Sequence, residues 1–220
     1  MREAQDQSAP GLRERKKEQT RRLIAETARR LFAERGFEQV TVADVARAAD
    51  VSQQTVFNYF PTKEDLVFWR LGAFEDDLLA TVRDRSPGES ALAAFRRFLL
   101  SRQGLLRSSA PEAREQLAAL LRTIEESPAL LAREQQIYAR YTDALAALLA
   151  EESAPDAGDL EPWVAANAMT GIHRALVRHA RRRVLDGARP PALAEEIRAN
   201  GEQAFALLER GLGSYAVRNG

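Results

Sequence analysis

The sequence predicts an all-α fold of about nine helices. Three observations favour this class: Ala, Leu, Arg and Glu dominate between the breaks, apolar residues recur at three- and four-residue spacing, and no segment alternates convincingly as a strand would. The 9 prolines and 12 glycines gather mostly at the breaks. A chain of 220 residues is long enough to bury a full hydrophobic core in one or two domains.

The first predicted helix covers residues 14–35 and is amphipathic. Its apolar face is built from Leu23, Ile24, Ala28, Leu31 and Phe32, and the opposite face is basic. After it, Gly36 predicts a left-handed stop, and Phe37 can fold back on the last turn as in a Schellman motif. The helix is therefore bounded at its carboxyl end.

A short helix is predicted next. Thr41 followed by Asp44 has the spacing of a capping box, with Asp in place of Glu, and opens a helix that can run only two turns. A turn follows at Asp50 and Val51. Such a turn predicts that a second helix packs against the first at an angle.

The second short helix covers residues 53–60. Ser52 is positioned to cap it, and Pro61 ends it because the residue before a proline is pushed out of the helical region. Thr62 with Asp65 repeats the capping spacing and predicts a longer helix that begins at Thr62.

Proline, glycine and serine breaks divide the rest of the chain into about five more helices. The organisation predicted from these boundaries has three parts. Residues 1–12 form a disordered N-terminus, residues 13–65 a helix-turn-helix domain, and residues 66–220 a larger helical domain.

A long helix followed by two short ones is the tri-helical helix-turn-helix, whose last helix lies in the DNA major groove. Val56 and Phe60 fall on its core side. The polar side chains left outside can hydrogen-bond to base edges, as Gln and Asn do with adenine; they are Gln53, Gln54, Thr55 and Asn58. Tyr59 and Lys63 stand where they can hold phosphates. The alternative is a pair of packing helices in a helical adaptor without DNA binding.

Residues 31–66, LFAERGFEQVTVADVARAADVSQQTVFNYFPTKEDL, resemble the tetracycline-repressor (TetR) family of bacterial transcription regulators. Two positions depart from the family pattern: Asp50 stands where members usually have Gly, and Phe57 where they often have Tyr. Asp tolerates a left-handed turn at some cost, and Phe57 lacks the hydroxyl that could bond a phosphate.

The resemblance implies a role for each matched residue. Thr41 caps the first short helix and contacts a phosphate, and Tyr59 and Lys63 grip the DNA backbone. The residues implied to face the groove are again Gln53, Gln54, Thr55 and Asn58. The family further implies a homodimeric, ligand-responsive regulator, usually a repressor, on a pseudo-palindromic operator of double-stranded DNA.

Positive charge is concentrated at the start of the chain. Residues 1–36 hold ten Lys/Arg against six Asp/Glu, a net +4, whereas the whole chain has 32 of each and a net charge of zero. The cations just ahead of the first helix resemble an arm that reaches DNA: Arg13, Arg15, Lys16 and Lys17. Glu14 and Glu18 interleave with them, so a solvated charge run is an equal alternative.

Residues 66–220 are expected to bind a small effector and to dimerise. Apolar and aromatic residues on several helices are candidates to line a cavity: Phe74, Phe95, Phe98, Leu117, Leu121, Tyr138, Tyr141, Trp163 and Met169. A filled core is the alternative. Arg174, Arg178 and Arg182 share a helical face that could bind a phosphate or carboxylate, or could simply complement the helix dipole.

The C-terminal half loosely resembles regulators of acyl-CoA-like ligands or of mycofactocin-type gene clusters. The expected effector is therefore small and largely apolar, in one version acyl-CoA-like, with a drug-type inducer as the alternative. In the family the last two helices pair with their symmetry mates. Here residues 191–215 carry a stripe of Ile197, Gly201, Ala204, Phe205, Leu208, Leu212 and Tyr215, which could serve that purpose or be buried within the protomer.

Several classes are disfavoured by what the sequence lacks. It has no cysteine, no GxxxxGK[ST] and no GxSxG, and His173 and His179 are six residues apart, so an enzyme, a metal site and a cofactor are not expected. No apolar run approaches a membrane span, and the N-terminus is too polar for a signal peptide. A cytoplasmic location without membrane contact is expected.

Overall fold

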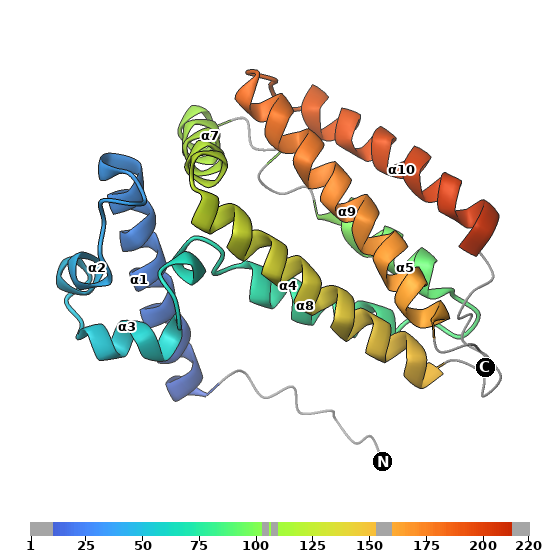
Figure 1. Ribbon diagram of the computed structural model, residues 1–220, viewed down its shortest axis with the longest axis horizontal. Helices are drawn as coiled ribbons and strands as arrows, with labels where there is room; N and C mark the ends of the chain where they lie inside the picture. Colours follow the sequence, from blue (N-terminus) through green and yellow to red (C-terminus); the bar gives the residue numbers. More distant parts are fainter. Residues whose placement is uncertain (1–10, 103–105, 107–109, 153–159, 213–220) are drawn as a thin grey trace, which may run out of the picture. The chain divides into compact units, whose positions relative to one another are not determined.

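A computed structural model describes residues 11–102, 106, 110–152 and 160–212 of the chain. In these residues the chain forms nine α-helices, one 3-10 turn and no β-strand, which confirms the all-α prediction (Figure 1). The disorder expected at the N-terminus concerns residues 1–10, which lie outside the described part, whereas Leu12 already begins the first helix.

The chain divides into two compact units, Met1–Trp69 and Arg70–Gly220. The sequence places this division after residue 65. The first unit contains α1 (Leu12–Arg35), α2 (Val42–Ala48), α3 (Gln53–Tyr59) and the 3-10 turn η1 (Glu64–Leu66). The second contains α4 (Leu71–Arg83), α5 (Ala91–Ser101), α7 (Pro111–Glu126), α8 (Pro128–Glu152), α9 (Glu161–Leu185) and α10 (Ala192–Leu212).

The buried face of α1 contributes to the hydrophobic core of the first unit. Ile24 and Ala28 are fully buried there, whereas Leu23, expected on the same face, is 51% exposed because it lies about 100° around the helix from Ile24. At the helix end the Phe37 ring packs edge-on against Phe32, with 5.0 Å between ring centroids. The fold-back expected of Phe37 is confirmed.

The backbone at the end of α1 differs from the expected motif. Gly36 has the positive φ of 82° that the sequence predicts, but its ψ of 151° is extended. Its N–H donates to the Phe32 carbonyl oxygen at 2.9 Å. The stop is therefore glycine-dependent without being a Schellman turn, because the chain must leave the helix extended to reach α2.

The caps of the two short helices are confirmed. The Asp44 N–H donates to Thr41 Oγ1 at 3.2 Å, and the Thr41 N–H donates to an Asp44 carboxylate oxygen at 3.0 Å. At the start of α3 the Thr55 N–H donates to Ser52 Oγ at 3.0 Å. Between the helices Asp50 adopts a φ of 54°, the left-handed turn predicted at this position.

The longer helix predicted from Thr62 is wrong. Its capping contacts form, since the Thr62 N–H donates to the Asp65 carboxylate at 3.0 Å, but only the 3-10 turn η1 follows and α4 begins at Leu71. Leu66 and Phe68 are both buried, at 1% and 8% exposure. Residues two apart in an α-helix point about 200° apart, so burying both on one core requires the chain to leave the helix here.

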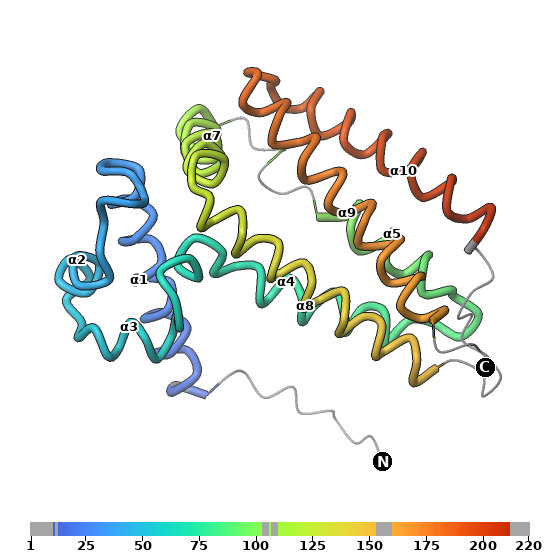
Figure 2. The backbone as a smooth tube through the Cα atoms, in the orientation of Figure 1, coloured from blue at the N-terminus to red at the C-terminus, as the bar shows by residue number. Residues whose placement is uncertain are grey.

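In the second unit α9 is the central helix: it contacts α5, α7, α8 and α10 (Figure 2). The interface between α8 and α9 contains buried polar pairs as well as apolar side chains. Thr142 Oγ1 donates to Thr170 Oγ1 at 3.0 Å, and Arg181 bonds to Glu134. Because a buried polar group must keep its partner, these pairs fix how the two helices align.

None of the helices in the described ranges is both long enough and apolar enough to cross a membrane.

Candidate nucleic-acid interface and ligand site

The outer face of α3 is polar and open to solvent. Gln53, Gln54 and Asn58 are exposed on it, while Val56 on the opposite face is fully buried and anchors the helix to the core. Thr55 is half-buried, and its Oγ1 lies 2.8 Å from Ser52 Oγ. Gln53, Gln54 and Asn58 are thus exposed as the sequence predicts, whereas Thr55 is partly engaged in the helix cap.

Gln54 and Asn58 form a pair one helical turn apart. Gln54 Nε2 donates to Asn58 Oδ1 at 3.0 Å. Each amide keeps further hydrogen-bonding capacity, namely the Oε1 acceptor of Gln54 and the Nδ2 donor of Asn58. An adenine edge in the major groove presents one acceptor and one donor, so the pair offers the complementary groups in a fixed geometry.

Two of the expected phosphate ligands have structural contacts of their own. The Thr41 hydroxyl donates to the Asp44 carboxylate at 2.6 Å, and these contacts lower the pKa of Asp44. Lys63 Nζ donates to the Phe37 carbonyl oxygen at 3.0 Å and lies 4.0 Å from the centre of the Phe37 ring. The sequence offered no local pattern for this contact, which joins residues 26 positions apart. Tyr59 is half-buried at the end of α3.

The predicted position of the basic residues, just ahead of the first helix, is wrong. Arg13, Arg15, Lys16 and Lys17 all lie within α1, which starts at Leu12, and all four are exposed. Good helix formers with interleaved glutamates continue the helix over this stretch, because acidic side chains favour its first turn. These cations therefore project from a helix.

In the second unit, aromatic residues from α4, α5 and α8 gather around His173 of α9. The Phe74 ring stacks on the imidazole at 5.0 Å between ring centroids, and Tyr138 lies edge-on at 5.6 Å. Tyr141 Oη is 2.7 Å from His173 Nδ1. Phe98 completes the group, 5.2 Å from Phe74. Four of the expected ligand-site residues are thus brought together.

His173 is at the centre of this group but was absent from the expected ligand site. It is 7% exposed, and burial lowers its pKa to about 4, so the imidazole is neutral near pH 7. Burial also raises the pKa values of Tyr138 and Tyr141. The cluster therefore presents neutral hydroxyl and imidazole groups among aromatic rings.

The other expected ligand residues differ in burial. Phe95 is buried against Phe205 of α10, and Trp163 is 51% exposed. Met169 is buried, whereas Leu117 and Leu121 are half-buried on α7. That all of these residues line one cavity stays a prediction.

Of the five arginines of α9, the three predicted to share a face are exposed: Arg174, Arg178 and Arg182. Arg174 is nevertheless engaged: its guanidinium bonds to Gln135 Oε1 and lies 5.5 Å from the centre of the Tyr138 ring. Arg178 and Arg182 are exposed. Only Arg174 therefore adjoins the aromatic cluster.

The described residues contain no group of three or more His, Cys, Asp or Glu that could hold a metal ion.

Two known families match the chain. Residues 24–68 match the family described as "Bacterial regulatory proteins, tetR family", and residues 89–213 match the "MftR C-terminal domain". The second match alone spans more than half of the chain. This chain belongs to the tetR family of bacterial regulatory proteins. The TetR resemblance on residues 31–66 is thereby confirmed.

Individual relatives agree with this membership. The HTH-type transcriptional regulator TcmR of Streptomyces glaucescens is 30% identical over 154 residues, 69% of this chain and 68% of TcmR. A Mycobacterium tuberculosis protein named as the mycofactocin biosynthesis transcriptional regulator MftR is 27% identical over 71% of this chain and 77% of its own. A solved SmeT–triclosan complex shares the fold, with a TM-score of 0.54 at 15% identity, over 87% of this chain and 90% of that one.

Family membership gives the first unit its function. TetR-family proteins are DNA-binding transcriptional regulators that bind operator DNA and small-molecule effectors as dimers. The helix-turn-helix of α2 and α3 lies inside the matched residues 24–68. The chain is therefore a DNA-binding transcription regulator.

The stripe of α10 expected at a TetR-type dimer interface is largely buried within the protomer. Phe205 is fully buried against α5, and Gly201 lies so close to Leu100 that an added Cβ would be 2.5 Å from its Cδ2. Tyr215 lies outside the described residues. The large apolar side chains exposed on α9, on the cap residue before it and on α10 are Leu160, Trp163, Val164 and Leu207, between 49% and 66% exposed.

Proposed function

We propose that this protein is a homodimeric transcriptional repressor that binds a pseudo-palindromic operator and is released from it by a small, largely apolar effector. The observation that carries the DNA part is the exposed face of α3, where Gln53, Gln54 and Asn58 stand on a capped helix anchored by Val56. Neutral donors and acceptors on a rigid recognition helix suit direct reading of bases.

The contact roles follow from this placement. Gln53, Gln54, Thr55 and Asn58 read base edges, and Thr41, Tyr59 and Lys63 hold phosphates. An ammonium group has three N–H donors, so Lys63 can contact a phosphate while it remains bonded to the Phe37 carbonyl. The exposed cations of the first turns of α1 add a sequence-independent attraction for DNA.

The dimer is proposed to form through α9 and α10. Leu160, Trp163 and Val164 recur at three- and four-residue spacing on α9, and together with Leu207 they are the large apolar side chains most exposed in the described part of the second unit. Apolar side chains gathered on a helix face favour burial against a partner. A two-fold dimer presents two recognition helices, which predicts an inverted repeat.

The effector is proposed to bind at the aromatic cluster of Phe74, Phe98, Tyr138 and Tyr141. Its rings suit an apolar ligand, and neutral His173 with the Tyr hydroxyls offers a few hydrogen bonds for orientation. An acyl-CoA-like effector would add a phosphate contact at Arg174, Arg178 or Arg182, whereas an uncharged drug would not need one.

A DNA selection on the purified protein tests the proposal. Random duplexes are enriched over several rounds, sequenced, and then bound in gel shifts with and without acyl-CoAs. An enriched inverted repeat that the ligand releases is the expected result. Failure to enrich any sequence would favour the helical adaptor, and a site without two-fold symmetry would contradict the dimer.

A further inference from the structure

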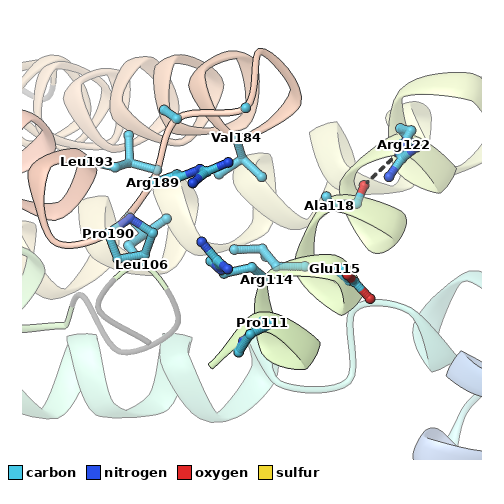
Figure 3. A pocket seen from close by; sticks show the side chains of 13 residues that line it. Leu106, Pro111, Arg114, Glu115, Ala118, Arg122, Val184, Arg189, Pro190 and Leu193 are labelled. Carbon is cyan, nitrogen blue, oxygen red and sulfur yellow. Dashed lines mark hydrogen bonds between the residues drawn. The ribbon is translucent and has the colours of Figure 1, made fainter. Parts of the chain in front are cut away.

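A cavity of about 290 Å³ lies in the second unit, away from the aromatic cluster (Figure 3). One wall is the amino-terminal half of α7, and the other is the end of α9 with the turn that leads to α10. Apolar side chains line part of it, among them Leu117, Val184, Pro190 and Leu193. This site plays no part in the function proposed above.

Three arginines line the same cavity: Arg114 and Arg122 of α7, and Arg189 of the turn before α10. In Figure 3 the Arg114 and Arg189 side chains extend toward the cavity from its two walls, while the Glu115 carboxylate points away from them. With one carboxylate against three guanidiniums, the lining carries a formal charge of +2. A lining of this composition attracts anions.

Arg114 is half-buried and lacks the ion pairs that the buried arginines of this unit have. Its Nε is buried and has no hydrogen-bond partner, and neither Arg114 nor Arg189 forms an ion pair with any described residue. By contrast, the buried Arg85 pairs with Glu152, and Arg181, whose Nε likewise has no hydrogen-bond partner, forms ion pairs with Glu125 and Glu134. A guanidinium whose Nε is shielded from water gains from an anionic partner, so the ligand that suits this site is negatively charged.

We propose that this cavity binds an amphipathic anion, a carboxylate or phosphate monoester with a short apolar group. The acidic group lies between Arg114 and Arg189, whose planar guanidiniums suit bidentate bonding to either oxyanion. The apolar group contacts Leu117, Val184 and Leu193. A cavity of about 290 Å³ is at the small end for ligand sites, so the ligand has few carbon atoms.

This cavity is not the anion site that the sequence predicts on α9. Arg174, Arg178 and Arg182 do not line this cavity, and Arg189 was not singled out in the sequence because it stands alone in a proline-rich turn. The turn brings it opposite α7, which lies more than sixty positions earlier in the chain. Tertiary structure alone creates this pairing.

Calorimetric titration of the full chain tests the proposal without operator DNA, so its outcome is independent of the proposed repressor function. The probes are hexanoate, hexyl phosphate, hexanol and inorganic phosphate. They are titrated into the wild type and into Arg114→Gln and Arg189→Gln. The matched control is Arg198→Gln, which changes a surface arginine of α10 that is paired with Glu202 at 3.7 Å.

Binding of hexanoate or hexyl phosphate is expected to weaken roughly 10- to 100-fold in each cavity variant and to stay unchanged in Arg198→Gln. The two anionic probes show whether the carboxylate or the phosphate is preferred. Hexanol binding as tightly as hexanoate, or inorganic phosphate as tightly as hexyl phosphate, would overturn the proposal. So would wild-type affinity in Arg189→Gln, a variant whose exposed side chain can change without disturbing the core.

Discussion

At the scale of single residues, Lys63 combines a structural and a proposed DNA-binding role. Lys63→Ala is expected to weaken binding to every duplex alike and to reduce the slope of log affinity against log salt by about 1. It is also expected to lower the free energy of unfolding by about 1 to 2 kcal/mol, because the bond to the Phe37 carbonyl and the ring contact are lost. Salt-series gel shifts and urea unfolding measure both effects.

A Lys63→Ala protein with wild-type affinity and salt slope would remove Lys63 from the phosphate contacts. Tyr59→Phe is expected to weaken operator binding uniformly as well, through loss of one phosphate hydrogen bond. It provides a comparison in which the contact of Lys63 with Phe37 stays intact.

The Gln54 and Asn58 amides are expected to determine base preference. Gln54→Ala or Asn58→Ala should relax the preference at particular base pairs by roughly 1 to 3 kcal/mol. Because the two side chains bond to each other at 3.0 Å, the double variant should lose less than the sum. Competition gel shifts with singly substituted operators measure this, with the exposed Gln39→Ala as control. A uniform loss across all sequences would instead mean that these residues contact the backbone.

Because His173 is buried and neutral, the free energy of unfolding is expected to depend on pH. Burial lowers its pKa from the ordinary 6.5 to about 4. Between these values the unfolded chain binds a proton that the folded protein does not, so the free energy of unfolding falls as pH drops from 6.5 toward 4, by roughly 1.4 kcal/mol per pH unit at most. Above pH 6.5 the contribution is constant.

Urea unfolding at pH 7.5 and pH 4.5 measures this dependence in the wild type and in His173→Asn. The other titratable groups are the same in both proteins, so the difference between the two pH dependences isolates His173. Equal loss of stability in wild type and variant between these pH values would contradict a buried neutral imidazole.

The residue-scale features differ in how far the sequence predicts them. Thr41, Ser52 and Asp50 are local, since each cap or turn involves partners within three positions, and all three were predicted. The contact of Lys63 with Phe37 and that of Tyr141 with His173 join residues 26 and 32 positions apart. No spacing along the chain encodes such contacts, because they depend on how the helices pack.

At the scale of elements, α2 and α3 have seven residues each and depend on their caps and the turn between them. Asp50 adopts a left-handed conformation that glycine would adopt without strain. We expect Asp50→Gly to raise the free energy of unfolding by up to about 1 kcal/mol and Asp50→Ala to lower it by about the same amount.

Thermal unfolding of both Asp50 variants checks this prediction. Gly72→Ala is a useful control for a glycine–alanine exchange, since Gly72 lies in α4 and an added Cβ meets no atom within 4 Å. Destabilisation by Asp50→Gly would show that the Asp50 side chain contributes more than its backbone strain costs.

The sequence misplaces two features of the first unit, for different physical reasons. The capping signal at Thr62 is genuine, yet burial of Leu66 and Phe68 ends the segment as a 3-10 turn. The cations near Arg13 have the composition of an arm, yet helix propensity keeps them within α1. Tertiary burial thus ends the first segment early, whereas local helix propensity extends the second toward the N-terminus.

At the scale of the whole molecule, the all-α class was predictable because it rests on periodicity along the chain. Which apolar helix faces are buried in the protomer and which are exposed was not predictable. Ile197 and Phe205 of α10 are buried within the protomer, although their stripe resembles an assembly surface. When a helix has two apolar faces, its sequence does not show which face is buried in the protomer and which is exposed. Only the packed structure shows that Leu207 is exposed to solvent.

The proposed dimer is therefore tested by substituting the exposed apolar side chains of α9 and α10. Trp163→Lys together with Leu207→Lys is expected to give a monomer in sedimentation at concentrations where the wild type is a dimer, because a charge placed on each helix opposes burial against a partner. Both side chains are more than half exposed, at 51% and 64%, so the fold of the protomer should persist in circular dichroism. Operator affinity should fall with the dimer, since one recognition helix contacts only one half-site.

Leu23→Lys is the matched control for this variant. Leu23 is exposed to the same 51% as Trp163 but lies on α1 in the first unit, outside the proposed interface. It should leave the sedimentation of the dimer unchanged. If the double variant still sediments as a dimer, the subunits associate through another surface. If it is monomeric yet binds the full operator with wild-type affinity, then dimerisation is not what brings two half-sites together, and the inverted repeat expected of the operator loses its physical basis.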